Sequence, residues 1–198
     1  MQNQGGISRM QKRVQFIEYW MVPVLSIAAA IGLNVLLLLV DLARFSPAYQ
    51  EAASILYEVP FARQILVTGL LMPLIEEVCF RKIMYQLLKK WTTVVVAMCV
   101  SSLLFGLYHG NLVQFVYATI CGFLLAYFYE AYGNIWACIL AHMCMNLIAC
   151  ILTKLEVLSW IMGDVTRAIA VISLMFIIFI LVFIRNFRVS KKWMLQKC

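Results

Sequence analysis

Charged residues are absent from long stretches of the chain, and these stretches predict its membrane helices. Five of them contain no Asp, Glu, Lys or Arg: 19–40, 64–75, 91–129, 131–153 and 168–184. A membrane helix needs about 20 apolar residues, so 91–129 is too long for one span, and we divide it at the turn signal HGN, 109–111. In contrast, 64–75 becomes a full span only if its helix continues through Glu76 and Arg81. The pattern therefore predicts six helices, over about 17–41, 61–90, 93–109, 112–130, 134–152 and 168–186.

Composition agrees with this membrane assignment. The 198 residues are 65% hydrophobic and only 13% charged, whereas soluble domains average about 25% charged residues. We predict an all-α, polytopic membrane helix bundle that forms a single domain over residues 1–198 and lies in the lipid bilayer. The net charge of +7 does not indicate a nucleic-acid partner, because the basic residues lie at the predicted membrane ends.

The basic residues are unequally divided between the two sides of the predicted bundle. Twelve of the sixteen Lys and Arg residues fall on the side that holds both termini, and the other four are mixed with acidic residues. Because cytoplasmic loops carry an excess of Lys and Arg, we expect both termini to face the cytoplasm. The twelve are Arg9, Lys12, Arg13, Arg81, Lys82, Lys89, Lys90, Arg185, Arg188, Lys191, Lys192 and Lys197.

A few ionisable residues interrupt the predicted membrane interior, where each needs a partner or a function because charge is costly there. Glu77 and Arg81 are four residues apart, which is the spacing of an ion pair on one helix face. Glu76 points about 100° away from Glu77 and has Phe80, an apolar residue, four positions on. Glu76 is therefore an intramembrane carboxylate without a helical ion-pair partner.

Two histidines and an asparagine are predicted at similar depth to Glu76. At about 1.5 Å per residue from the cytoplasmic ends of their helices, Glu76 lies about 21 Å deep and His109 about 24 Å deep. On the same scale His142 lies about 12 Å deep and Asn146 about 18 Å deep. His142 and Asn146 share one helix face, because they are four residues apart. We therefore expect three helices to bring these polar side chains into one site.

These residue types together favour hydrolysis by an activated water. A carboxylate and an imidazole can deprotonate a water molecule. An imidazole N–H and a carboxamide N–H one helical turn apart can both donate to a developing oxyanion. No serine or cysteine has the surroundings of a nucleophile. A zinc site of Glu76, His109 and His142 with one open position is an alternative, although no HExxH motif occurs.

Three motifs follow one another along the chain. Glu76, Glu77 and Arg81 form EExxxR, Phe105 and His109 form FxxxH, and His142 and Asn146 form HxxxN. In this order, each on an apolar segment, they resemble the CAAX protease and bacteriocin-processing (Abi) family of intramembrane glutamate endopeptidases. The resemblance covers about residues 61–149, which we expect to be the catalytic core.

The resemblance implies a role for each motif residue. Glu76 and His109 would activate the water, and His142 and Asn146 would form the oxyanion hole. Glu77 and Arg81 would support Glu76. No metal and no other cofactor is implied.

The resemblance also implies a setting for the protein. The short chain is similar to small bacterial members of the family, so we expect a multi-pass protein of the bacterial plasma membrane. Its substrate would be a peptide or membrane protein, and its role the maturation of a bacteriocin or peptide signal, or self-immunity. A bacteriocin immunity protein without enzymatic activity is the main alternative to a peptidase. A transporter is a weaker one, because no inverted repeat is visible. The sequence does not indicate an oligomeric state.

Overall fold

The computed structural model describes residues 18–195, and every regular element in that part of the chain is a helix. Six elements correspond to the predicted membrane helices: α2 (Met21–Leu39), the rod α4–α6 (Phe61–Trp91), α7 (Val94–Tyr108), α8 (Leu112–Tyr132), α9 (Ile135–Lys154) and α11 (Val165–Leu195). The rod consists of α4 (Phe61–Gln64), η3 (Ile65–Leu71), α5 (Met72–Glu77), η4 (Val78–Tyr85) and α6 (Gln86–Trp91). The shorter elements are η1 (Glu18–Trp20), η2 (Leu42–Phe45), α3 (Pro47–Glu58) and α10 (Val157–Met162).

The predicted all-α membrane bundle is confirmed. Among the described residues, fewer than six helices are long and apolar enough to count as membrane spans. Four helices are long and apolar enough to cross a membrane, and a fifth span results if α3 and the rod, which meet at 116°, count together. Helix α7 is short, with 15 residues. Helix α3 was not predicted because its charged residues break the apolar pattern, although Pro47 at its first turn is a helix start signal. Six crossings and a single domain over 1–198 stay predictions.

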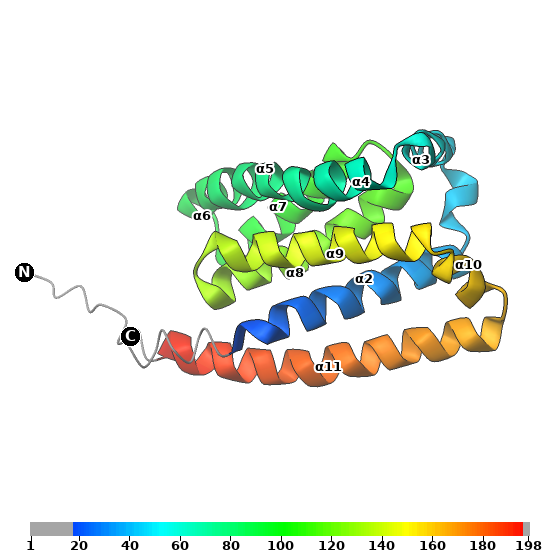
Figure 1. Ribbon diagram of the computed structural model, residues 1–198. Coiled ribbons are helices and arrows are strands. Elements are labelled where there is room, and N and C mark those ends of the chain that lie inside the picture. The colour runs from blue at the N-terminus through cyan, green and yellow to red at the C-terminus, as the bar shows by residue number, and fades with distance from the viewer. Residues whose placement is uncertain (1–17, 196–198) are drawn as a thin grey trace, which may run out of the picture.

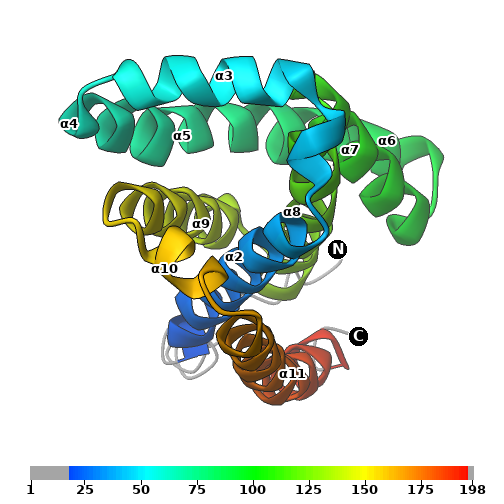
Figure 2. The ribbon, with the colours of Figure 1, turned by 90° about the vertical axis from the view of Figure 1, so that its right-hand side faces the viewer.

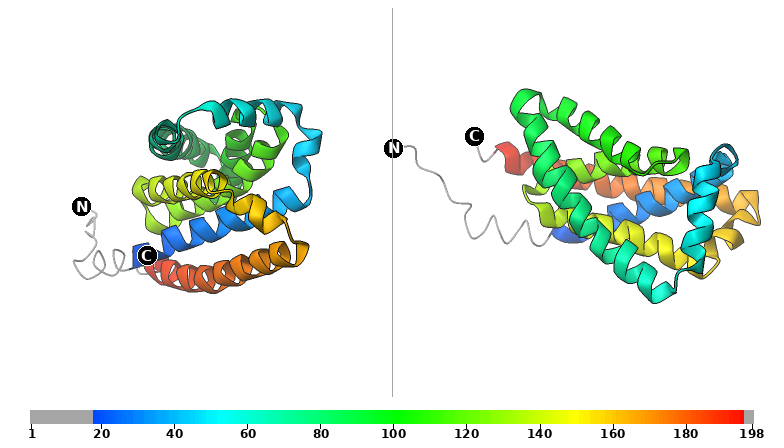
Figure 3. Two further views of the ribbon diagram at one scale, coloured as in Figure 1. Left: turned by 45° about the vertical axis from the view of Figure 1, so that its right-hand side comes forward. Right: turned by 90° about the horizontal axis from the view of Figure 1, so that it is seen from above.

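The helices form layers around α2, α8 and α9. Helix α11 packs on α2 at one edge of the bundle, and the rod α4–α6 lies at the opposite edge against α9 (Figures 1 and 2). Seen from above, the rod crosses the other helices obliquely (Figure 3). Only 6% of the most apolar 18-residue stretch of α11 is buried, so this helix offers most of its surface to lipid.

The described chain begins and ends at the same end of the bundle. There Glu18 accepts from Arg185 Nη2 at 3.2 Å, and Asn186, which is buried, donates to the hydroxyl of Tyr132 at 2.6 Å. The two ends of the described chain therefore lie on the same side of the bundle, which agrees with the prediction that both termini face one side of the membrane. The assignment of that side to the cytoplasm stays a prediction, and both termini, with Arg9, Lys12, Arg13 and Lys197, lie outside the described residues.

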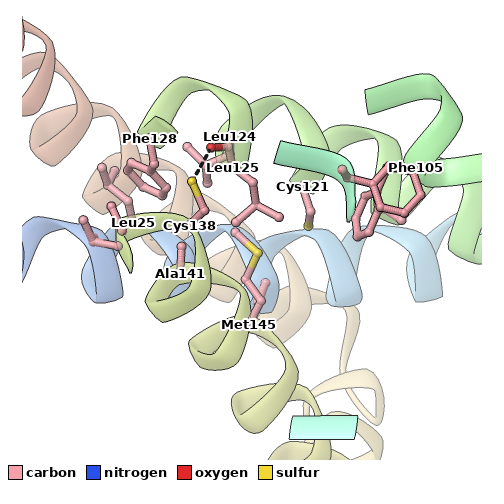
Figure 4. Packing of buried hydrophobic residues seen from close by; sticks show 14 of the residues in the cluster. Leu25, Phe105, Cys121, Leu124, Leu125, Phe128, Cys138, Ala141 and Met145 are labelled. Atoms are coloured by element: carbon pink, nitrogen blue, oxygen red, sulfur yellow. Dashed lines mark hydrogen bonds between the residues drawn. The ribbon is translucent and has the colours of Figure 1, made fainter. Parts of the chain in front are cut away.

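The apolar core lies where α2, α8 and α9 meet (Figure 4). Leu25, Leu125, Phe128 and Met145 are almost completely buried in it. Cys138 is also buried here, and its thiol donates to the carbonyl of Leu125 at 3.2 Å. This cysteine is thus a packing residue, as expected for a small side chain inside a helix bundle.

Gly122 allows α7 and α8 to lie close together near the site that the sequence predicts. A Cβ added at Gly122 would lie 3.1 Å from both the Cα and the Cβ of Ser102. Small residues at such crossings allow membrane helices to pack backbone against backbone. The crossing places Phe105 of α7 and the carbonyl of Gly122 next to the middle of the rod.

Candidate active site

Two adjacent glutamates lie on the buried side of the rod. Glu76 is 7% exposed and Glu77 is fully buried. They end the short α-helical turn α5, which has a π-helical segment on either side. A π-helical segment alters the direction of side chains relative to a regular α-helix and is frequent at functional sites. In this way a mostly apolar rod presents two neighbouring carboxylates to the same helix, α9.

Glu77 and Arg81 form the predicted ion pair. Arg81 Nη1 lies 3.2 Å from Glu77 Oε1, and Arg81 is 1% exposed. Its other terminal nitrogen, Nη2, donates to the carbonyl of Gly122 on α8 at 3.2 Å. The guanidinium also lies over the ring of Phe105, 4.4 Å from the centroid. Arg81 therefore joins the rod to α7 and α8 while it neutralises Glu77.

His142 lies between the two carboxylates. Its Nδ1 is 2.8 Å from Glu77 Oε1, and its Nε2 is 3.6 Å from Glu76 Oε2. Because Glu77 is paired with Arg81 and accepts, Nδ1 carries the hydrogen of this bond. Nε2 then faces Glu76 either as a lone pair or, in the protonated ring, as a second N–H donor.

His109 follows the last turn of α7. Its Nδ1 lies 2.8 Å from the carbonyl of Phe105. A carbonyl only accepts, so Nδ1 carries the hydrogen and Nε2 of the neutral ring is a free acceptor. His109 and His142 both contact Phe105 edge-on, with centroid distances of 5.0 and 5.6 Å. One aromatic ring therefore joins the two imidazoles, and His142 in turn faces Glu76.

Asn146 lies one turn after His142 on α9. Its Nδ2 donates to the carbonyl of Thr68 in η3 at 2.9 Å. One of its two amide hydrogens is used in this bond, and the second is left for another acceptor. Asn146 is partly exposed, whereas His142 is buried.

The structure thus brings most of the predicted residues together and adds contacts that the motifs did not indicate. Glu76, Glu77, Arg81 and His142 are in direct contact, and Phe105 connects them with His109. The contact of Glu77 with His142 was not expected, since Glu77 was interpreted only as support for Glu76. The backbone carbonyls of Thr68 and Gly122 were also missed, because a backbone acceptor leaves no signal in the side-chain pattern.

Two carboxylate oxygens at this site have no hydrogen-bond partner among the described residues, Glu76 Oε2 and Glu77 Oε2. Buried polar atoms are normally satisfied, so such atoms call for a functional explanation. Within residues 18–195 no group of three His, Cys, Asp or Glu side chains has the geometry to hold a metal ion. The site is therefore built from carboxylates, imidazoles and amide groups with an unsatisfied carboxylate at its centre.

A polytopic helical membrane protein with a buried glutamate–histidine–arginine site is the class that this fold and site define. Residues 58–148 match the family described as Type II CAAX prenyl endopeptidase Rce1-like. The chain is also 30% identical, over 134 residues, to the Bacillus subtilis (strain 168) protein named "Putative membrane peptidase YdiL". The chain belongs to the CAAX protease and bacteriocin-processing family, which confirms the resemblance of its three motifs.

The extent of these similarities is limited. The alignment covers 68% of this chain and 54% of the Bacillus subtilis protein, so the chain spans about half the length of that curated relative. No solved structure matches the chain.

Proposed function

We propose that this protein is an intramembrane endopeptidase that cleaves a peptide or membrane-protein substrate with an activated water. The observation that carries this proposal is the unsatisfied oxygen of Glu76, which is buried in a membrane bundle and faces His142. The family membership and the peptidase name of the relative support the same reaction class.

In the proposed reaction, Glu76 accepts a proton from a water while His109 Nε2 accepts a hydrogen bond from the same molecule and orients it. The water oxygen forms a bond to the carbonyl carbon of the scissile peptide, and the carbonyl oxygen becomes an oxyanion. Glu76 then gives its proton to the leaving nitrogen as the C–N bond breaks. General acid–base catalysis of this kind contributes about 10²- to 10⁴-fold to the rate.

The oxyanion would be stabilised from α9. His142 Nε2, when protonated, and the second amide hydrogen of Asn146 are the two proposed donors. Glu77 holds His142 through Nδ1 at 2.8 Å and so fixes the direction of Nε2, and Arg81 compensates the charge of Glu77. Glu77 and Arg81 therefore act through His142 as well as on the stability of the bundle.

The proposal is tested with Glu76→Gln, which keeps shape and removes the base. Purified protein in detergent is incubated with a mixed peptide library in heavy-oxygen water, and products are identified by mass spectrometry. We expect wild-type products to carry the heavy oxygen at the new carboxylate, and Glu76→Gln to lose about 10²- to 10⁴-fold in rate. Glu130→Gln is the matched control, because Glu130 is a paired glutamate on α8 outside the site.

Retained cleavage by folded Glu76→Gln protein would refute the proposed mechanism. Wild-type protein that cleaves nothing, yet protects cells from a bacteriocin equally well with Gln at position 76, would instead support the immunity alternative. We also propose a bacterial plasma-membrane location, which rests on the family resemblance, and cytoplasmic termini, which rest on the distribution of Lys and Arg.

A further inference from the structure

Pro73 lies two residues after the end of η3, the π-helical segment that precedes the two glutamates. In a π-helix each carbonyl accepts from the N–H five residues later, and the Met72 N–H donates to the carbonyl of Val67 in this register. The next bond would run from residue 73 to the carbonyl of Thr68. Pro73 has no N–H. The carbonyl of Thr68 is therefore left without the helical donor that this register would supply.

Asn146 supplies the missing donor from a different helix. Its Nδ2 lies 2.9 Å from the Thr68 oxygen, across 78 positions of sequence. Backbone carbonyls inside a membrane bundle need a partner, because lipid offers none. The carbonyl released by Pro73 is thus a fixed acceptor that points from the rod to α9.

A close helix contact lies beside this hydrogen bond. Gly69 follows Thr68 and is buried. A Cβ added at Gly69 would lie 2.6 Å from Cδ2 and 3.3 Å from Cγ of Leu147, the residue after Asn146. The rod and α9 therefore approach one another so closely here that only a glycine fits without rearrangement. This approach places the carboxamide of Asn146 within reach of the Thr68 oxygen.

We propose that Pro73 is a positioning residue for Asn146. By removing one N–H from the rod, it frees the Thr68 carbonyl to hold one amide hydrogen of Asn146 and so to fix the direction of the other. Its effect on catalysis rests on the proposed function, in which that second hydrogen stabilises the oxyanion. The hydrogen bond itself does not depend on that function.

The inference is tested with Pro73→Ala, which restores an N–H that competes for the Thr68 carbonyl. Alanine is the best helix former, so the rod is expected to stay intact. We expect kcat to fall while KM stays nearly unchanged. The decrease in kcat should be smaller than the loss of an oxyanion donor causes, which is about 10²- to 10³-fold. Pro23→Ala is the matched control, because it makes the same substitution near the start of α2 and leaves Pro73 in the rod unchanged.

Two measurements separate positioning from a general effect on folding. In an Asn146→Ala background, Pro73→Ala should cause no further loss of kcat. In protein labelled with isotope-enriched asparagine, the side-chain amide signals of Asn146, identified by their loss in Asn146→Ala, should shift in Pro73→Ala and stay in place in Pro23→Ala. Unmoved amide signals, or a full additional loss of kcat in the double variant, would overturn the inference. Shifted signals with full turnover in Asn146→Ala would uphold the positioning and refute the proposed role of Asn146.

Discussion

Removal of Arg81 should destabilise the bundle more than the loss of one hydrogen bond would suggest. Arg81→Ala leaves the fully buried Glu77 with only His142 as a partner and also removes the donor to Gly122. At 3.2 Å the Coulomb attraction of the pair is about 5 kcal/mol if the effective dielectric constant is about 20. Breaking a buried pair in this way typically costs about 3–5 kcal/mol, and the lost contact with the Phe105 ring adds about 0.5–2 kcal/mol.

The effect of this change can be measured as a shift in melting temperature. For a chain of this size, about 2–4 °C per kcal/mol gives a decrease of roughly 6–20 °C for the loss of the pair alone. The assay is thermal unfolding in detergent, followed by the fluorescence of a thiol-reactive dye. Arg185→Ala is the control, because Arg185 pairs with Glu18 at the exposed end of the bundle and should cost at most about 1 kcal/mol.

The double variant Glu77→Gln with Arg81→Gln decides whether the two charges compensate each other. It removes both charges, so it should recover part of the stability that Arg81→Gln alone loses. A double variant that melts no higher than the less stable single variant would refute the reasoning, because the destabilisation would then come from lost packing and not from an uncompensated carboxylate.

The other predictions concern the reaction, the metal alternative and the orientation. Asn146→Ala should lower kcat by about 10²- to 10³-fold with KM nearly unchanged, because an oxyanion donor acts once charge develops. Steady-state kinetics on a cleaved peptide will check this, and a change confined to KM would contradict it. Stringent chelation should leave activity intact, and metal analysis of the same sample should find no stoichiometric zinc. The water-activating pair of Glu76 and His109 would be refuted if removal of bound zinc abolished cleavage and its return restored it. Reporter fusions after Cys198 and within residues 46–58 should report the cytoplasm and the opposite side, respectively, and an extracellular C-terminus would overturn the orientation.

The fold was predictable where the cost of charge in a membrane is large. The long intervals without charged residues are helical, with two helices in 91–129, and the Glu77–Arg81 pair followed from four-residue spacing alone. Helix α3 escaped prediction because it contains Glu51 and Glu58 and so resembles a loop in a pattern based on charge. The two π-helical segments were also missed, since periodicity over a few residues does not distinguish them from an α-helix.

The sequence predicted that the candidate site residues lie near one another, but it did not predict all of their contacts. Depth counted along separate helices placed Glu76 at about 21 Å and His142 at about 12 Å, and the structure brings their side chains to 3.6 Å from one another. The bond of His142 to Glu77 depends on the rotation of α9 relative to the rod, which depth does not determine. The acceptor of Asn146 is a backbone oxygen, so its identity follows only from the helical register around Pro73.

The exposed position of α11 has a consequence for how the sequence can change. A helix that touches mainly α2 and otherwise faces lipid must remain apolar, but the shape of most of its side chains is under little constraint. A deep mutational scan should therefore find that α11 accepts exchanges among Leu, Ile, Val and Phe almost anywhere along its length. Asn186 should be the exception, because it is buried and bonded to both Tyr127 and Tyr132. In homologous chains the apolar residues of this helix should vary widely, whereas the residue at position 186 should stay polar.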